Sequence, residues 1–233
     1  MSQPSHQAGL ILDGIAYSCA SPVLNWYQHG LETKIGGNNK KRKPGQIVDL
    51  FVVHWTGGTG DASRLFRVLG TRELGVEFFI DYDGTIYQFC DPVLVNTADA
   101  GFINPRSYGV EVRCLGIPRK GVKTPDQPTY YTTLRGRKRE YVHFTQAQYK
   151  ALYDLYQALS EAKHPLLKLP LRVPCDAGGS LLTRTMTPYE IKLYSGAIGH
   201  YHISDNKADP GTAPLQYLAD RWGLKEPVSN AQQ

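Results

Sequence analysis

The segment Ile47–Val53 places the strongest constraint on the fold. All of its residues except Asp49 are apolar, and most are β-branched. An apolar run of this length predicts a strand that is buried on both faces, as in α/β proteins. His54 ends the run, and the glycine-rich loop 55–60 separates it from Asp61, which is a predicted helix N-cap. A polar residue at the end of a buried strand lies where α/β sheets place ligand sites.

Two further strand patterns follow along the chain. The dipeptide Asp83-Gly84 between the apolar runs 76–81 and 85–89 predicts a tight β-hairpin. Segment 108–115 has a period of two, which puts Glu111 on the face opposite its valines. Glu111 therefore faces either a site or the surface, where it would pair with the nearby Arg113.

Helices are predicted at four places. Thr145 and Thr187 each begin a capping box, with glutamine or glutamate three residues later. These boxes predict helices from 146 to about 162 and from 188 toward 195. The other two predicted helices follow Asp61 and span 213–222, where apolar residues recur at helical spacing.

Length and composition fit one sizeable core or two small ones, since the chain has 233 residues of which 41% are hydrophobic. The net charge of +5 is compatible with an anionic partner, such as nucleic acid, an acidic wall polymer or a membrane surface, or with an ordinary basic surface. No apolar run is long enough to predict a membrane span. The four cysteines lack metal-binding spacing and are expected to be buried thiols.

Changes in composition divide the chain. Residues 1–46 are predicted to be an N-terminal extension that ends in an exposed linker, because 36–45 is rich in glycine and basic residues. Residues 47–223 form the predicted main domain, and 224–233 a disordered tail. Within the main domain, 117–140 is expected to be an irregular basic insertion, either a solvated loop or a grip on an anionic or saccharide polymer.

Segment 199–211 contains two histidines, a lysine and two aspartates that could bind a metal or stabilise an anion. A hydrolytic zinc site takes three protein ligands and keeps one position open, and the chain offers His54, either His200 or His202, and Asp209. Glu111 could carry a proton and Lys207 could stabilise an oxyanion, which together fit amide hydrolysis. The chain lacks a compact zinc motif of the HExxH kind, so these residues alone leave metal binding and purely structural roles both open.

Four segments in sequence, 52–56, 78–88, 108–111 and 199–211, resemble the type-2 N-acetylmuramoyl-L-alanine amidases. That family includes phage endolysins, the cytosolic amidase of bacterial wall recycling and the related peptidoglycan recognition proteins. The resemblance covers roughly 47–223. It implies an α/β fold, in which a single domain with a central mixed β-sheet is flanked by helices. It also implies one zinc ion, and cleavage of the amide bond between N-acetylmuramic acid and L-alanine of peptidoglycan.

Carried over position by position, the resemblance implies a set of site residues. His54, His200 and Asp209 match the three metal ligands, and the choice of His200 over His202 follows the family's Gly-His pair. Glu111 matches the catalytic carboxylate, and Lys207 matches the lysine two residues before the third ligand.

Three positions depart from the common family pattern. Glu77 and Asp99 stand where many members have histidine, and His202 stands where aspartate is common. These residues are expected to contact the substrate or to support the site, and Glu77 could share the acid–base role.

The leading expectation is a cell-wall lytic enzyme, a bacteriolytic hydrolase of the endolysin kind. The alternatives are a non-catalytic peptidoglycan-binding module and a cytosolic amidase that recycles muropeptides. A nucleic-acid partner is not expected, and the protein is expected to act as a monomer. The first residues lack the features of a signal peptide. Synthesis in the cytosol is therefore expected, with action on the wall after release or export, although cytosolic action is also compatible.

Overall fold

The computed structural model describes residues 9–125, 127–223 and 226–227. Its centre is a six-stranded mixed sheet with the order β13-β5-β9-β6-β7-β3. The strands are β3 (Val23–Asn25), β5 (Leu50–Trp55), β6 (Phe78–Ile80), β7 (Ile86–Gln88), β9 (Ser107–Val112) and β13 (Gly196–Gly199). The first four strands in this order are parallel, whereas β7 runs antiparallel to β6 and parallel to β3. The carboxyl ends of β13, β5 and β9 therefore lie together at one edge.

Strand β5 is the buried strand that the sequence predicts. Phe51 and Val53 belong to the largest apolar cluster, whereas Leu50 and Val52 belong to a second cluster on the other face. All four side chains are fully buried. Because both faces are covered, the polar His54 at the end of this strand is also buried.

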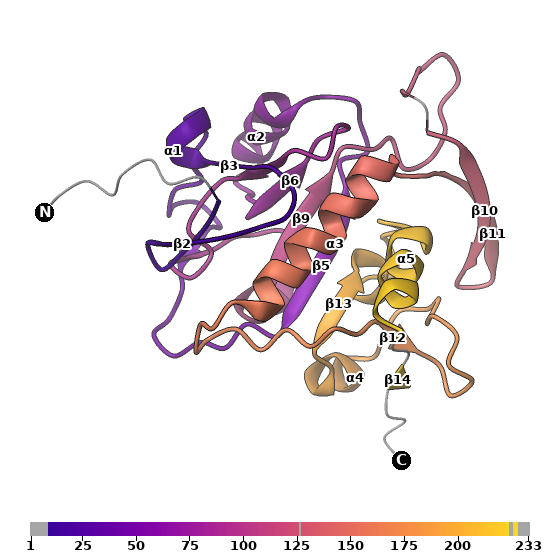
Figure 1. Cartoon of the computed structure of the whole chain (residues 1–233). Helices are drawn as coiled ribbons and strands as arrows, with labels where there is room; N and C mark the ends of the chain where they lie inside the picture. The colour runs from indigo at the N-terminus through magenta and orange to yellow at the C-terminus, as the bar shows by residue number, and fades with distance from the viewer. Residues whose placement is uncertain (1–8, 126, 224–225, 228–233) are drawn as a thin grey trace, which may run out of the picture.

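Helices cover both faces of the sheet. The described residues form five α-helices, which are α1 (Trp26–His29), α2 (Ala62–Thr71), α3 (Gln146–Glu161), α4 (Pro188–Leu193) and α5 (Ala213–Trp222). Figure 1 shows α3 lying across one face, with α5 beside it near β13. Ile191 of α4 belongs to the same apolar cluster as Leu50 and Val52 on the opposite face, and α2 packs on the β6 region. Two 3₁₀-helices, η1 (Gly101–Arg106) and η2 (His200–His202), complete the helical elements that the structure describes.

Local signals in the sequence explain where these helices begin. Capping boxes are present at Thr145 and at Thr187, as predicted, and the Asp61 side chain accepts a hydrogen bond from Arg64 N at the start of α2. The predicted hairpin around Asp83-Gly84 is also confirmed, since β6 and β7 pair antiparallel across it.

The basic segment 117–140 is not irregular throughout, and that prediction was wrong from Thr129 onward. Residues from there form β10 (Thr129–Leu134), which pairs antiparallel with β11 (Arg137–Val142). The two-residue turn between them, Arg135-Gly136, has positive φ at both positions (51° and 72°), as in a type I′ turn. We refer to this element as the β10–β11 hairpin.

The N-terminal residues are integrated into the domain, which differs from the predicted extension. Strand β3 forms one edge of the central sheet, and Leu10 and Leu12 are fully buried in the largest apolar cluster. Arg42 lies within the segment that was expected to be an exposed linker, yet it is only 4% exposed. Leu10, Leu12 and Val23 are thus part of one core with residues of the remaining strands.

Three short two-stranded sheets complete the fold. They pair β1 (Leu10–Leu12) with β2 (Ile15–Tyr17), β4 (Lys40–Lys41) with β8 (Val95–Asn96), and β12 (Pro174–Cys175) with β14 (Glu226–Pro227). The predicted disordered tail, 224–233, lies outside the described residues except for 226–227, which form β14.

Across the described ranges, no helix combines the length and apolar character needed to cross a bilayer. The four cysteines are free thiols, and all except Cys19 are buried.

Candidate metal centre and active site

Three adjacent parallel strands bring polar residues to one edge of the sheet. His54 on β5 is directly opposite Glu111 on β9 in the pairing register. Gly199 at the end of β13 is paired with Val53, so the next residue, His200, follows β13 on the other side of His54. The carboxyl ends of parallel strands meet at the same edge, which is why residues far apart in sequence converge here.

Asp209 completes a cluster of three possible metal ligands. Its Oδ2 atom lies 3.0 Å from Nδ1 of His54 and 3.1 Å from Nδ1 of His200. The two imidazole rings are nearly perpendicular, with centroids 4.6 Å apart. All three residues are buried, and the ligand atoms that they offer lie within 4.8 Å of one another.

This donor set fits zinc. Two imidazole nitrogens and a carboxylate oxygen are ordinary zinc ligands, with bonds of about 2.0–2.2 Å. Two such bonds at a tetrahedral angle separate their ligand atoms by about 3.3 Å, close to the separations between Asp209 and each imidazole. Three protein ligands leave the fourth position open, as in catalytic zinc sites rather than structural ones.

The electrostatic environment of the cluster is negative. Burial lowers the pKa of His54, but the nearby carboxylates of Asp209 and Asp99 outweigh this effect and raise the pKa to about 10. Burial likewise opposes ionisation of Asp209, yet the two imidazoles hold the pKa of its carboxyl below its usual range. The negative charges that stabilise a proton on His54 would stabilise a divalent cation at the same place.

Glu111 faces this cluster from the neighbouring strand. Its Oε2 atom is shielded from solvent and has no hydrogen-bond partner among the described residues. Burial raises its pKa to about 8, and the negative charges of Asp209 and Asp99 act in the same direction, against the effect of His54. Arg113 pairs instead with Asp81, at 2.8 Å. Glu111 is therefore an unpaired carboxyl at the site rather than half of a surface ion pair.

A cavity of about 210 Å³ opens onto the cluster. Its lining includes His54, Glu111, His200, Asp209 and Lys207. It also includes Trp55 and Arg72, which the sequence did not single out as site residues. Arg72 follows α2 as its C-cap, and no motif marks such a position.

Asp99 lies behind His54 on the side away from Asp209. Its Oδ2 atom is 3.3 Å from Nε2 of His54, and both atoms are buried. A β-carbon on Gly109 would lie only 1.8 Å from this oxygen, so glycine at 109 is what lets Asp99 approach β9. Asp99 is thus placed to orient the His54 ring, as carboxylates do behind metal-bound histidines.

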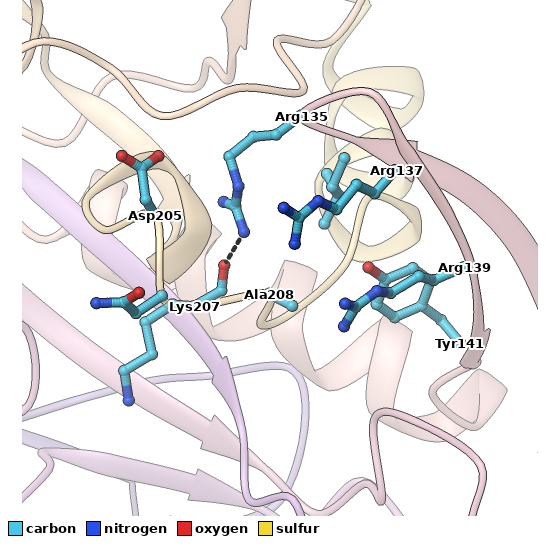
Figure 2. Close-up of a pocket in the computed structure, with 9 residues that line it drawn as sticks. Arg135, Arg137, Arg139, Tyr141, Asp205, Lys207 and Ala208 are labelled. Atoms are coloured by element: carbon cyan, nitrogen blue, oxygen red, sulfur yellow. Dashed lines mark hydrogen bonds between the residues drawn. The ribbon is translucent and has the colours of Figure 1, made fainter.

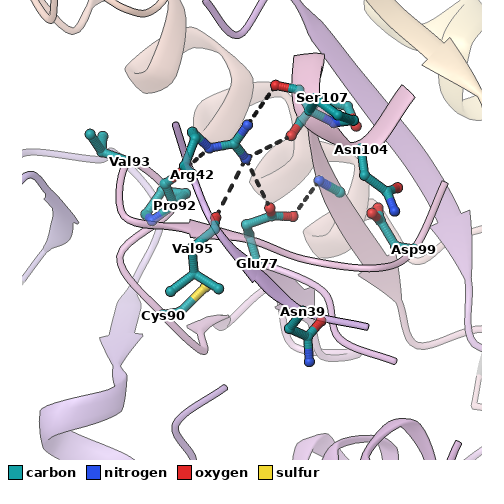
Figure 3. A network of polar contacts seen from close by, with 12 residues as sticks. Asn39, Arg42, Glu77, Cys90, Pro92, Val93, Val95, Asp99, Asn104 and Ser107 are labelled. Carbon is teal, nitrogen blue, oxygen red and sulfur yellow. Dashed lines mark hydrogen bonds and ion pairs between the residues drawn. The ribbon is translucent and has the colours of Figure 1, made fainter. Parts of the chain in front are cut away.

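Glu77 belongs to a different cluster, seen in Figure 3. Its Oε2 atom accepts a hydrogen bond from Gly109 N at 2.7 Å, and its Oε1 atom lies 3.6 Å from Nη2 of Arg42. Burial and the nearby Asp99 raise its pKa to about 7, while Arg42 lowers it. Glu77 is only 1% exposed and is not part of the cavity lining described above.

His202 is turned into the protein interior. Its Nδ1 atom accepts a hydrogen bond from Gly199 N at 3.0 Å, and Nε2 lies 2.8 Å from the carbonyl oxygen of Leu182. Burial lowers its pKa to about 3. Both ring nitrogens are engaged, so His200, and not His202, points to Asp209.

Comparison with known protein families gives one match. Residues 43–212 match the family described as N-acetylmuramoyl-L-alanine amidase. This range spans most of the chain and contains all three possible metal ligands together with Glu111 and Lys207. No curated protein sequence matches the chain.

Several solved structures are similar at low sequence identity. The amidase LysC of Clostridium intestinale is 13% identical, with a TM-score of 0.48 and coverage of 87% of this chain and 98% of LysC. The endolysin of the Thermus scotoductus bacteriophage Ph2119 is 16% identical, with a TM-score of 0.49 and coverage of 85% and 97%. Escherichia coli AmiD is 19% identical, with a TM-score of 0.46 and coverage of 77% and 58%.

Proposed function

Because the chain belongs to the N-acetylmuramoyl-L-alanine amidase family, we propose that it is a zinc-dependent amidase of peptidoglycan. The bond cut is the amide between the lactyl group of N-acetylmuramic acid and the L-alanine of the stem peptide. The observation that carries this proposal is the convergence of His54, His200 and Asp209 at 3.0–3.1 Å, with the unpaired Glu111 beside them.

His54, His200 and Asp209 would hold the metal ion. When bound, zinc supplies Lewis acidity toward a carbonyl oxygen and lowers the pKa of water toward neutrality. The three side chains are fixed by β5, by the start of η2 and by their mutual contacts, so the site needs little rearrangement. Asp99 would keep the proton of His54 on Nε2, which leaves Nδ1 free as a ligand.

Glu111 is the proposed proton carrier. Its carboxylate would take a proton from the attacking water and deliver it to the nitrogen of L-alanine. Its Oε2 atom has no hydrogen-bond partner among the described residues, and Glu111 lines the cavity at the cluster, so it is placed to hold that proton between the two transfers. The amide C–N bond breaks and a C–O bond forms, which leaves a lactyl carboxylate and a free amino group on L-alanine.

Lys207 is the proposed oxyanion donor. It lines the same cavity as Glu111 and the metal-ligand cluster. Its ammonium group would donate a hydrogen bond to the carbonyl oxygen as negative charge develops there. Glu77 and His202 have structural contacts of their own, so we propose no step of the reaction for them.

The direct test is the release of peptides from purified sacculi. The zinc-loaded protein should release stem peptides with a free L-alanine amino group and leave lactyl carboxylates on the glycan, both measurable by mass spectrometry. Glu111→Gln should bind the same amount of zinc without releasing peptides. Sacculi that stay intact with fully zinc-loaded wild-type protein, while still binding it, would instead favour a non-catalytic peptidoglycan-binding module.

We also propose that intact wall, rather than soluble muropeptide, is the main substrate, as for a bacteriolytic endolysin. Rates on sacculi and on a soluble muropeptide, measured with the same protein, separate the two. A strong preference for the soluble muropeptide would favour a role in wall recycling.

A further inference from the structure

The β10–β11 hairpin encloses a second cavity next to the metal centre, of about 540 Å³. Four of its lining residues are cationic, namely Arg135, Arg137, Arg139 and Lys207, and one, Asp205, is acidic. We refer to this cavity as the cationic pocket. Figure 2 shows the three arginines on the hairpin side, facing the loop that carries Lys207 and Ala208. Its volume is within the range of small-molecule sites.

The strand pattern places these residues on one face of the hairpin. Side chains alternate along β11, so Arg137, Arg139 and Tyr141 point to the same side, and all three line the cationic pocket. Lys138 points to the other side, where its Nζ atom lies 5.6 Å from the centre of the Tyr131 ring. The hairpin therefore separates its basic residues into a pocket-lining set and an outer one.

The walls of the pocket are fastened to the segment that carries the site. At the hairpin turn, Arg135 donates hydrogen bonds to the carbonyl oxygens of Lys207 (2.7 Å) and Tyr201 (3.3 Å). Near the other end of β10, the Tyr130 hydroxyl accepts a hydrogen bond from Ala213 N at 3.3 Å. These bonds fix the hairpin against the chain on both sides of Asp209.

Two of the pocket cations have no counter-charge. Within the part of the chain that the structure describes, neither Arg137 nor Arg139 forms an ion pair or a side-chain hydrogen bond. Asp205, the acidic lining residue, accepts a hydrogen bond from Thr185, and Arg135 is occupied by the carbonyls named above. Two free guanidinium groups on one wall are suited to bind a planar oxyanion such as a carboxylate.

We propose that the cationic pocket binds a free carboxylate of the stem peptide while the scissile amide lies at the metal centre. Lys207 lines both cavities, so they are adjacent and one substrate molecule can reach both. This inference rests on the proposed amidase function, since it assigns an orientation to that substrate. Arg137 and Arg139 are then determinants of substrate specificity.

The test uses two synthetic muramoyl peptides, identical except that the peptide carboxylates are free in one and amidated in the other. Binding is measured by calorimetry on zinc-loaded Glu111→Gln protein, which holds substrate without turnover. We expect the free-carboxylate peptide to bind about tenfold more tightly, the effect of one charge-assisted hydrogen bond. Adding Arg137→Gln and Arg139→Gln should abolish this preference, whereas the matched change Lys138→Gln should keep it.

The possible outcomes separate this proposal from the proposed function. Equal affinity for the two peptides, or a preference that survives both arginine changes, would overturn the pocket assignment, even if the wild-type protein cleaves both peptides. A preference that depends on Arg137 and Arg139, without cleavage by the wild-type protein, would support the pocket and reject the amidase. If the arginine changes weaken binding to sacculi but not to either peptide, the pocket binds a wall polyanion instead, and the stem-peptide proposal is wrong.

Discussion

Two buried clusters of charged residues meet at β9 and differ in how their polar atoms are satisfied. In the cluster around Arg42, the guanidinium donates hydrogen bonds to four backbone carbonyls, of Pro92, Val95, Pro105 and Ser107. Glu77 adds an opposite charge at 3.6 Å. Around the possible metal ligands, by contrast, buried atoms of His54 and of the neighbouring Asp99 and Glu111 lack hydrogen-bond partners among the described residues, and a cavity opens onto them.

The difference teaches that burial of charge does not by itself mark an active site. Both clusters are shielded from solvent. Glu77 Oε1 also lacks a hydrogen-bond partner among the described residues, but it lies 3.6 Å from the Arg42 guanidinium, whose own nitrogens all donate to backbone carbonyls, as is typical of a structural role. The unpaired atoms around His54 face a cavity, where an ion and a substrate can supply the missing partners. The following predictions test this division.

The largest effect is expected from removing a proposed metal ligand. Asp209→Asn should reduce zinc occupancy to near zero and lower kcat by about 10³-fold or more, since the ion provides several kcal/mol of transition-state stabilisation. Metal analysis and peptide release from sacculi measure the two effects. Asp220→Asn on the exposed side of α5 is the matched control, and it should change neither. Full zinc occupancy in Asp209→Asn would reject the ligand set.

Glu111→Gln should lower kcat by about 10²- to 10⁴-fold, the usual range for losing a general acid–base group. Zinc content and KM should stay close to the wild-type values, because the amide keeps the shape of the carboxyl. A steady-state kinetic comparison with measured zinc content tests this. If zinc content falls together with kcat, Glu111 acts through the metal ligands and not on the substrate.

The Arg42 cluster should respond in the opposite way. Arg42→Met leaves Glu77 buried without its counter-charge, and we expect the free energy of unfolding to fall by about 3 kcal/mol. Zinc content and kcat of the folded fraction should be unchanged. Denaturant unfolding of metal-free protein measures the loss. The double variant Arg42→Met/Glu77→Leu should recover part of it, and no recovery would mean that the two side chains do not act as a pair.

Asp99 links the two clusters and should have an intermediate effect. Asp99→Asn should weaken zinc binding about 10- to 100-fold, because the neutral amide no longer orients His54 through its Nε2–H. Competition with a chelator of known affinity measures this change. A variant with wild-type zinc affinity but reduced stability would place Asp99 with Glu77 and Arg42 as a structural residue.

The smallest effect is expected at a partly exposed pair, Arg184–Glu190, which serves as a reference. Hydrogen bonds from Arg184 lower the pKa of Glu190 to about 2, below its ordinary value of 4.5. The ionised carboxylate therefore contributes stability above pH 4.5, and this contribution is lost as the pH falls through 2. Arg184 is 46% exposed, so we expect only about 1 kcal/mol. The difference in unfolding free energy between wild type and Glu190→Gln should shrink over this pH range.

Local signals in the sequence were sufficient to predict much of the fold. The capping boxes at Thr145 and Thr187 and the Asp83-Gly84 turn act within a few residues, so they hold in the structure without help from distant contacts. The Arg135-Gly136 turn is also local, but its flanking strands combine threonine, tyrosine and arginine rather than apolar residues. Because of this polarity, the segment was interpreted as an irregular loop.

The site depends on contacts that no local pattern encodes. The choice between His200 and His202 came only from the family resemblance, because both are histidines in the same short segment. In the structure they differ through Leu182 and Gly199, which occupy the ring nitrogens of His202. Arg42 was likewise predicted to lie in an exposed linker, because its neighbours in the sequence are basic. The four carbonyls that accept its hydrogen bonds come from other segments, which no local pattern indicates.

The spacing of the proposed metal ligands along the chain has a consequence for when the proposed activity can arise. His54 and Asp209 are 155 residues apart. These two residues and His200 come together only after β13 has joined the sheet beside β5. Such long-range pairing forms late in folding, because closing a large loop is entropically costly. A nascent chain that has not yet delivered residues 196–209 has no complete metal site. The proposed amidase is therefore expected to stay inactive until residues 196–209 have been synthesised and β13 has joined the sheet beside β5.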